Sequence, residues 1–283
     1  RASPSPYGYR GRARVAARRG RVGFRRRHSH AVSATSRCPV LVPALDAPLA
    51  ELAANPPEPT GEWELTAGSD GRAARARVPV RDSGSHVEIE VLGEWLRVSG
   101  GTFLQANALL REPLARAVVD AAGSGARCLE LFAGAGLFTI PLARRFARLV
   151  AVESHPGAVA DLEDNLRTAG LPDVEILARS VEEAFAANAL APLRPEVVVL
   201  DPPRAGLEPA ARDGLPRLGA HRVVYLSCDP ATLARDVAVL ADADYELVAL
   251  EGFDLFPQTA HVEALAVLEA RRGRRGTGSG SEV

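Results

Sequence analysis

Apolar and polar residues alternate through much of the first hundred residues, with the period expected of half-buried strands. Residues 9–27 place arginines between apolar residues on both sides of Gly20, which predicts a β-hairpin with one basic face. Residues 72–80 and 86–98 are two further strand-like stretches. We therefore expect a small mixed α+β domain over residues 1–99.

The same region contains one short helical segment and one loop. The apolar residues 40–52 predict a helix that Pro43 and Pro48 interrupt, because proline lacks the N–H that a helix interior needs. The proline-rich residues 55–61 predict a loop.

From about residue 100 onward, short apolar runs alternate with helix-compatible segments. The runs end at five pairs of residues, Leu131-Phe132, Val152-Glu153, Ile176-Leu177, Leu200-Asp201 and Leu226-Ser227. Residues 155–170 are one intervening helix, with Leu162 and Leu166 on one face and Gly170 as its stop. This alternation is typical of a doubly wound α/β fold, which we expect over residues 100–270.

Two closing strands, near residues 245–253 and 261–268, complete an expected sheet of seven strands. Residues 271–283 predict a disordered tail. No apolar run approaches the roughly 18 residues that a spanning helix needs, and no signal peptide is recognisable. Three scattered cysteines favour a reducing cytoplasm over a secreted, disulfide-stapled fold, and we expect a monomer. The chain begins at Arg1 and contains no methionine, so we expect it to be part of a longer protein.

The net charge of −1 hides an uneven distribution. Residues 1–45 contain eleven arginines and no acid, whereas the rest of the chain contains 23 arginines against 35 acids. A basic arm on an acidic body suggests a polyanionic partner that binds mainly at one end. A solvated, arginine-rich strand pair without a partner is an equally good interpretation of the charge alone.

Ligands of open parallel sheets bind at the carboxyl ends of the strands. Gly134 and Gly136 follow the first strand and allow a tight turn that a ligand can approach, but Thr139 stands where the dinucleotide fingerprint has its third glycine. Glu153 ends the second strand, where an acid can accept both hydroxyls of a ribose. The pattern favours S-adenosylmethionine over NAD, with glycines that serve only the turn as the alternative.

The fourth and fifth strands end in reactive side chains. Asp201 precedes two prolines, which make a stiff platform suited to a flat base. Cys228 follows the fifth strand into the same crevice, and a cysteine is the most nucleophilic side chain available at neutral pH. Cys128, at the opposite edge of the sheet, is expected to pack in the core. The sequence therefore predicts Cys228 as a nucleophile.

These pieces in series resemble the RNA 5-methyluridine methyltransferases that use S-adenosylmethionine. The resemblance runs from about residue 4 to residue 268, and its most specific motifs are "LELFAGAGLF", "DPPRAGL", "YLSCDPATLARD" and "FPQTAHVE". The stretch around "CPVL" resembles the iron–sulfur-containing enzymes that act on 23S ribosomal RNA, so the resemblance implies ribosomal rather than transfer RNA as the partner. It also implies a class I methyltransferase, Rossmann-like fold.

The resemblance assigns roles to individual residues. It implies cofactor contacts from Gln105, Phe132, Gly134, Gly136, Glu153 and Asp201. It implies that Cys228 adds to carbon 6 of the uracil and that Glu263 removes the proton from carbon 5. In the absence of an N-terminal RNA-binding barrel, the expected RNA contacts are Arg10, Arg12, Arg14, Arg25, Arg26 and Arg27.

Four positions depart from the pattern of the family. Cys38 stands alone where the iron–sulfur members use four cysteines for a [4Fe-4S] cluster, so we expect no cluster in this chain. Ala133 replaces a frequent cysteine. Asp229 replaces an asparagine and is expected to raise the pKa of Cys228 by like-charge repulsion. Ser180 replaces an acid that contacts adenine, which predicts weaker cofactor affinity.

Three other functions are compatible with parts of the sequence. An RNA 5-methylcytosine methyltransferase would also use a cysteine, but it usually has a second cysteine where this chain has Asp201. A non-catalytic RNA-binding remnant is a different class, which Asp229 makes plausible. A nicotinamide oxidoreductase is the weakest alternative because Thr139 breaks its fingerprint.

Overall fold

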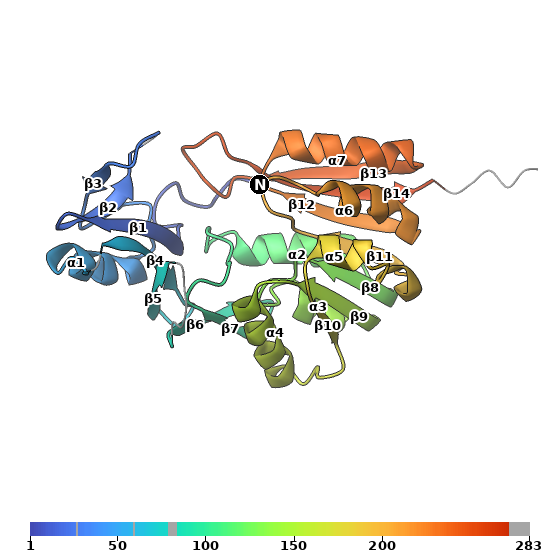
Figure 1. The fold of residues 1–283 in the computed structure, drawn as a ribbon, viewed down its shortest axis with the longest axis horizontal. Helices are drawn as coiled ribbons and strands as arrows, with labels where there is room; N and C mark the ends of the chain where they lie inside the picture. Colours follow the sequence, from blue (N-terminus) through green and yellow to red (C-terminus); the bar gives the residue numbers. More distant parts are fainter. Residues whose placement is uncertain (27, 59, 79–83, 272–283) are drawn as a thin grey trace, which may run out of the picture.

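A small antiparallel sheet lies beside a larger α/β layer structure in the computed structural model (Figure 1). The structure describes residues 1–26, 28–58, 60–78 and 84–271. Arg27 and nearly all of the predicted tail lie outside the described residues. Among the described residues, no helix is long and apolar enough to cross a membrane. The cytoplasmic location and the monomeric state stay predictions.

The larger sheet has seven strands in the order β10-β9-β8-β11-β12-β14-β13. In chain order these are β8 (Gly125–Leu131), β9 (Phe146–Glu153), β10 (Glu175–Ala178), β11 (Val197–Leu200), β12 (Arg222–Ser227), β13 (Tyr245–Phe253) and β14 (Glu263–Ala270). The first five pair in parallel, and β14 inserts antiparallel between β12 and β13. The predicted doubly wound sheet of seven strands is confirmed.

Helices cover both faces of this sheet. One face packs against α2 (Arg111–Ala122), α3 (Thr139–Ala143) and α4 (Pro156–Thr168), and the other against α5 (Val181–Ala186), α6 (Pro209–Gly214) and α7 (Pro230–Asp242). Short 3-10 turns, η2 (Ala191–Leu193) and η3 (Leu215–Leu218), accompany them. An apolar core lies on each face of the sheet, and alternate residues of β11 pack in each. Val197 and Val199 pack on the face covered by α2, α3 and α4, and Val198 and Leu200 on the other. A strand buried on both faces therefore reads as a continuous apolar run.

The small sheet contains the predicted hairpin. Its five strands, ordered β3-β2-β1-β4-β5, are β1 (Arg12–Arg18), β2 (Arg21–Arg25), β3 (Val32–Ala34), β4 (Gly61–Ala67) and β5 (Ala73–Val78). The hairpin turns at Arg19 and Gly20, both at positive φ. The sequence did not predict β3 or β4, and β4 pairs with β1 from Arg12 to Ala17.

The predicted helix near residue 45 forms as a 3-10 turn η1 (Pro43–Leu45) that continues into α1 (Asp46–Ala54). The expected interruption at Pro48 is wrong. Pro48 is the third residue of α1, where the backbone N–H has no intrahelical acceptor, so proline costs no hydrogen bond there.

The stretch 86–98, expected as one strand, is a two-stranded hairpin of β6 (His86–Val91) and β7 (Glu94–Ser99). Leu92 and Gly93 turn the chain at φ of 54° and 80°, as tight hairpins require. Ile89 and Leu96 are buried in the same apolar core as α2 and α4. The boundary predicted near residue 100 follows this hairpin and stays a prediction.

Candidate active site

The glycine turn after β8 makes room for a ligand on one side and for packing on the other. Gly134, at φ 59°, faces open space where a Cβ would lie. Gly136, at φ 98°, would bring a Cβ to 2.9 Å from Leu162 Cδ1 on α4. Phe132 adopts φ 63°, which is unusual for a bulky side chain and typical of strained functional turns. The two glycines thus have different roles.

Glu153 locks this turn to the tip of the neighbouring strand. One carboxylate oxygen accepts the N–H of Gly134 at 2.8 Å, and the other accepts those of Ser154 and His155, both at 2.7 Å. The acid therefore lies at the rim of the turn, where the sequence predicted a ribose-binding carboxylate.

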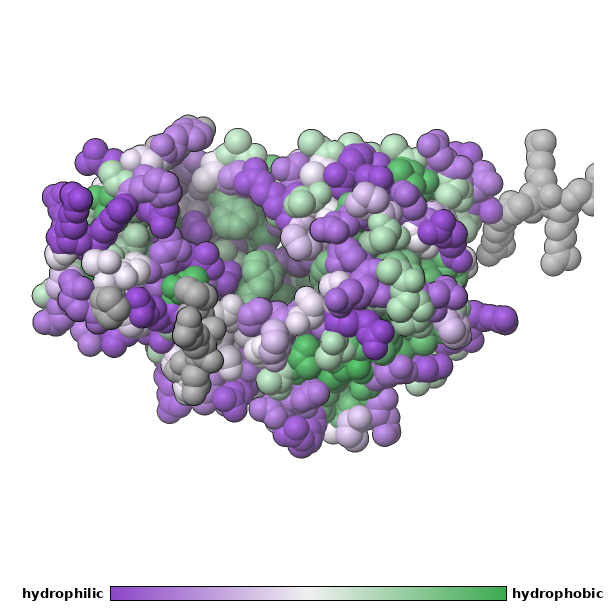
Figure 2. Space-filling model, viewed as in Figure 1, coloured by the Kyte–Doolittle hydropathy of each residue, from purple (hydrophilic) through white to green (hydrophobic). Residues whose placement is uncertain are grey.

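A small pocket of about 30 Å³ opens between the glycine turn and the segment that contains Phe103 and Gln105. Phe132 and Asp201 also line it, together with apolar side chains of β6, β7 and the turn. Figure 2 shows this face of the molecule hollowed between the small sheet and the larger part, with apolar surface inside the hollow. The predicted cofactor residues Gln105, Phe132, Gly134 and Asp201 are thus brought together around one cavity.

Asp201 lies directly after β11 and accepts a hydrogen bond from Gln105 Nε2 at 3.1 Å. Burial raises the pKa of Asp201 to about 7, although the bond from Gln105 opposes the rise. An acid near its pKa at neutral pH exchanges protons readily, which is a property of active-site carboxyls.

Cys228 and Glu263 lie at the same end of two paired strands. Ser227 of β12 pairs with Ala264 of β14, and Cys228 and Glu263 are the next residues outward. Cys228 is half-buried, and burial raises the pKa of its thiol, with further contributions from the carboxylates of Glu263 and Asp201. Glu263 is only 3% exposed, and burial followed by the charge of Asp201 raises its pKa to about 8.

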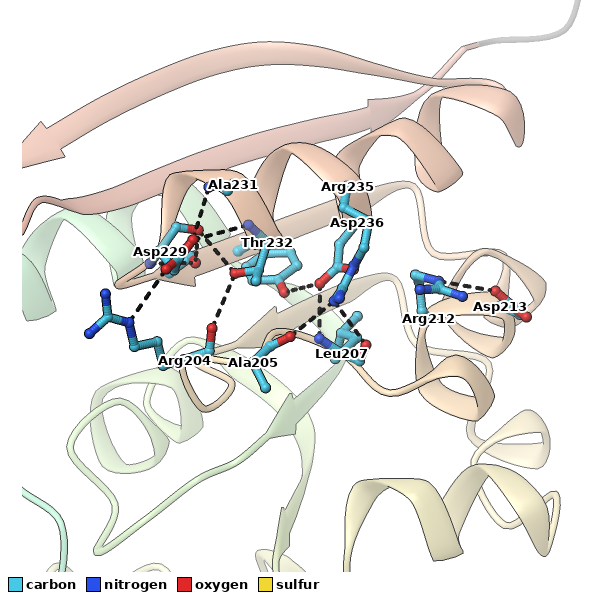
Figure 3. A network of polar contacts seen from close by, with 12 residues as sticks. Arg204, Ala205, Leu207, Arg212, Asp213, Asp229, Ala231, Thr232, Arg235 and Asp236 are labelled. Carbon is cyan, nitrogen blue, oxygen red and sulfur yellow. Dashed lines mark hydrogen bonds and ion pairs between the residues drawn. The ribbon is translucent and has the colours of Figure 1, made fainter.

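Asp229 does not act on Cys228 as predicted. It is the N-cap of α7, where one carboxylate oxygen accepts the N–H groups of Ala231 and Thr232 at 3.0 and 3.2 Å (Figure 3). Its other oxygen accepts a bond from Arg204 Nε at 3.4 Å. These contacts, the Thr232 N–H first, lower the pKa of Asp229. The expected cause of the raised Cys228 pKa is therefore wrong, because burial and two other acids produce it.

A buried acid on α7 holds the loop that follows Asp201. Asp236 accepts the N–H of Leu207 at 2.9 Å and the hydroxyl of Tyr225 at 2.7 Å, and it is 1% exposed (Figure 3). Gly206 passes so close that a Cβ would lie 2.7 Å from Asp236 Oδ2. Sequence reasoning missed Asp236, whose only sequence signal is an acid on the apolar face of a helix.

Glu130 is a second residue that sequence reasoning missed. It is the penultimate residue of β8, is 1% exposed, and neither carboxylate oxygen has a hydrogen-bond partner in the part of the chain that the structure describes. Burial raises its pKa to about 8; the nearby Thr139 hydroxyl, although outside hydrogen-bond geometry, opposes the rise, and the charges of Glu153 and Asp201 add to it. The signal was present as an acid inside the apolar run that ends at Leu131.

Ser180 and Cys128 both have structural roles. The Ser180 hydroxyl accepts the N–H of Glu183, whose carboxylate accepts the N–H of Ser180 in return, so the pair caps α5. Weaker cofactor affinity from the missing acid stays a prediction. Cys128 is 3% exposed within β8, which confirms that it packs in the core.

Several of the arginines expected to bind RNA already have partners within the chain. Arg12 pairs with Glu64 at 2.7 Å, Arg14 lies 3.6 Å from the same carboxylate, and Arg25 pairs with Glu62. The guanidinium of Arg10 lies 5.8 Å from the centre of the Phe256 ring, and Arg26 is exposed. The alternative of a solvated, ion-paired basic face therefore applies to part of this set.

Residues 71–271 match the family model described as tRNA (Uracil-5-)-methyltransferase. The chain belongs to this family. It is 36% identical to a 23S rRNA (uracil(1939)-C(5))-methyltransferase RlmD of Pseudomonas aeruginosa, over 93% of this chain and 68% of the relative. It is 35% identical to the RlmD protein of Edwardsiella ictaluri, over 94% and 70%. The predicted family is confirmed, and with it the RNA uracil-5-methyltransferase class of enzyme.

The fold of this uracil-5-methyltransferase family member is also found in a solved structure. A crystal structure of the Pyrococcus abyssi tRNA (uracil-54, C5)-methyltransferase, in complex with S-adenosyl-L-homocysteine, superposes with a TM-score of 0.76. The match covers 94% of this chain and 77% of that one at 24% sequence identity. At that identity the similarity concerns the fold.

The pocket residues fit an S-adenosylmethionine molecule. Gly134 leaves open space at the turn, Glu153 places a carboxylate at the rim, and the apolar lining suits an adenine ring and a methionine chain. The residues do not fit an iron–sulfur cluster, because Cys38 is one thiol and no group of three potential metal ligands occurs among the described residues.

Proposed function

We propose that this chain methylates carbon 5 of a uridine in 23S ribosomal RNA through a covalent adduct of Cys228. The observation that carries the proposal is the convergence of Cys228, Asp201 and Glu263 at adjoining strand ends beside the pocket of the glycine turn. Ribosomal RNA is favoured over transfer RNA because the curated relatives at 35–36% identity are named for 23S rRNA.

Carbon 5 of uracil is too weak a nucleophile to take a methyl group unaided. Addition of the Cys228 thiolate to carbon 6 forms a carbon–sulfur bond and moves the ring double-bond electrons toward the carbonyl at carbon 4. S-adenosylmethionine, when bound, supplies an electrophilic methyl carbon on a sulfonium. Carbon 5 of the activated ring forms the new bond to that methyl carbon, and the electrons of the broken carbon–sulfur bond stay with the donor.

The methylated ring then has to lose the hydrogen on carbon 5. We assign this step to Glu263, which takes the proton while the ring double bond re-forms and the thiolate of Cys228 leaves. A carboxyl whose pKa is about 8 is a stronger base, when ionised, than an ordinary glutamate. The charge of Asp201 also acts on the thiol, so we assign to Asp201 the proton that Cys228 loses, which leaves Glu263 ionised for the later step.

Entry of the base requires an unstacked uridine, since carbon 6 is inaccessible within a helix. Asp201 and the two prolines after it form the stiff edge against which we place the flat ring. Gln105 fixes the Asp201 carboxylate by its 3.1 Å bond and so orients that edge. RNA contacts from Arg14, Arg25 and Arg26 are proposed on their exposure and charge, with side chains of Arg14 and Arg25 about half exposed at 53% and 47%.

Methyl transfer from labelled S-adenosylmethionine to a uridine-containing 23S rRNA fragment tests this function. Digestion to nucleosides should recover the label in 5-methyluridine, with a parallel transfer RNA substrate labelled far less. Label in 5-methylcytidine would support the cytosine alternative instead. RNA that binds without any methyl transfer would support the non-catalytic remnant.

A further inference from the structure

A buried carboxylate of the small sheet, Glu64, binds both an arginine of that sheet and the segment that carries Gln105. Arg12 on β1 donates from Nη2 to Glu64 on β4 at 2.7 Å. The second oxygen of Glu64 accepts the N–H of Gly101 at 3.2 Å. Glu64 is 2% exposed, so its carboxylate is buried with partners on two separate parts of the fold. Arg14 lies 3.6 Å from the same oxygen, so Arg12 makes the shorter of the two ion pairs with this buried carboxylate, and its loss leaves the charge less well compensated.

Arg12 also holds an aromatic ring of the cofactor pocket. Its guanidinium carbon lies 5.4 Å from the centre of the Phe103 ring, which is within cation–π range. Phe103 lines the pocket two residues before Gln105 and is 58% exposed. The ring therefore contacts Arg12 and also lines the pocket.

The two ends of this segment are fastened by other contacts. The Thr102 hydroxyl donates to Asp161 on α4 at 2.9 Å. On the far side of Gln105, the N–H of Gly11 donates to the carbonyl of Ala106 at 2.7 Å. Phe103 and Gln105 lie between these anchors, and Arg12 with Glu64 is the side-chain contact from the small sheet that acts on this stretch.

We propose that Arg12 and Glu64 are positioning residues, which fix Phe103 and Gln105 at the cofactor pocket and thereby couple the small sheet to the active site. This inference rests on the proposed function and deepens it. It replaces the expected RNA contact of Arg12, because that guanidinium is already engaged by Glu64 and Phe103. The Arg12 side chain is 18% exposed, and its Nε is buried.

Glu64→Gln distinguishes a role of Arg12 in positioning the pocket from a role in contacting RNA. Glu64→Gln removes the negative charge that faces both Arg12 and Arg14, so the salt dependence of RNA binding is compared with that of Arg12→Gln, which leaves Arg14 in place. If Arg12 contacts a phosphate, the freed positive charge should tighten RNA binding and steepen its salt dependence. If Arg12 positions the pocket, Glu64→Gln should instead weaken binding of S-adenosylhomocysteine in the absence of RNA.

The experiment compares Arg12→Gln, Glu64→Gln, their double variant and the control Arg26→Gln in the full chain. Calorimetry with S-adenosylhomocysteine should show about a tenfold loss of affinity in Arg12→Gln and Glu64→Gln. The double variant should lose no more affinity for S-adenosylhomocysteine than either single variant, because each substitution already breaks the Arg12–Glu64 ion pair. Arg26→Gln should bind the ligand normally but lower the slope of log affinity for RNA against log salt by about one.

A separate variant guards against an effect of misfolding. Phe103→Leu leaves the ion pair intact and should reproduce the loss of S-adenosylhomocysteine affinity, with an unfolding midpoint close to that of the unaltered protein. The inference is overturned if Arg12→Gln and Glu64→Gln bind the ligand normally while Arg12→Gln reduces the RNA salt slope. Failure of the unaltered protein to transfer methyl groups, with ligand binding intact, would count against the proposed function alone.

Discussion

The carboxylate of Glu263 raises the pKa of the Cys228 thiol from the neighbouring strand of the sheet. The two residues stand at the ends of β12 and β14, which run antiparallel, so the proposed base and the proposed nucleophile lie at the same end of the sheet. The proposed reaction needs both groups beside one pyrimidine ring, because the thiolate of Cys228 adds to the ring and the carboxylate of Glu263 takes the proton when the thiolate leaves.

Removal of the Glu263 charge should make Cys228 more acidic. In Glu263→Gln, the pH midpoint for alkylation of Cys228 by iodoacetamide should move downward, because a like charge no longer opposes the thiolate. Mass spectrometry of the Cys228 peptide follows the reaction separately from Cys38 and Cys128. A midpoint that stays in place would show that the charge of Glu263 does not contribute to the thiol pKa.

Methyl transfer should speed up as the pH rises. Cys228 must lose its proton and Glu263 must be ionised, and both pKa values are raised, that of Glu263 to about 8. The base is therefore largely protonated below its pKa, so kcat/KM should climb from pH 6 and should still rise above pH 8, where the thiol of Cys228 titrates. Initial rates in buffers of constant ionic strength measure the profile. A profile that is flat between pH 6 and 8 would remove Glu263 as the titrating base.

Glu263→Gln should also stall the reaction after methyl transfer. Without a base the proton on carbon 5 remains, so the methylated adduct should accumulate on ordinary uridine-containing RNA. Denaturing gels with labelled RNA measure the adduct, and the control Glu246→Gln, an exposed acid, should form none. Normal turnover by Glu263→Gln would exclude this residue from the mechanism.

Glu130 should make the fold less stable as the pH rises. Its pKa of about 8 in the folded state exceeds the ordinary value of 4.5, so the folded state binds the proton more tightly. Its stability contribution is complete below about pH 4.5 and is lost as the pH rises through 8. The full shift corresponds to a free energy on the order of 5 kcal/mol.

Urea unfolding between pH 5 and pH 9 measures this effect. Relative to the unaltered protein, Glu130→Gln should lose less unfolding free energy over that interval, whereas Glu246→Gln should follow the unaltered curve. Parallel curves for the native protein and Glu130→Gln would show that this carboxyl does not titrate in the folded state.

Asp229 should matter for stability rather than for the nucleophile. Asparagine caps helices as well as aspartate does, so Asp229→Asn should leave both the unfolding free energy and the pH midpoint of Cys228 nearly unchanged. Asp229→Ala should cost about 1 kcal/mol of stability by removing the cap of α7. A Cys228 midpoint that drops in Asp229→Asn would restore the repulsion expected from the sequence.

The sequence predicted the sheet and its strand ends because strands buried on both faces leave unmistakable apolar runs. It also predicted that Asp201, Cys228 and Glu153 share one edge, since parallel strands align their carboxyl ends. What it missed depends on contacts across the fold. Tertiary packing determines the partners of Arg12 and Asp229 and the burial of Glu130, and a local sequence pattern does not predict such packing.

Trapping with 5-fluorouridine RNA tests the central claim most directly. Fluorine on carbon 5 cannot leave as a proton does, so the methylated adduct should persist after denaturation when labelled S-adenosylmethionine is supplied. Digestion and mass spectrometry should place the modified nucleotide on Cys228, and Cys228→Ala should give no adduct. An adduct on another residue, or equal trapping by Cys228→Ala, would contradict the assignment of this thiol as the nucleophile.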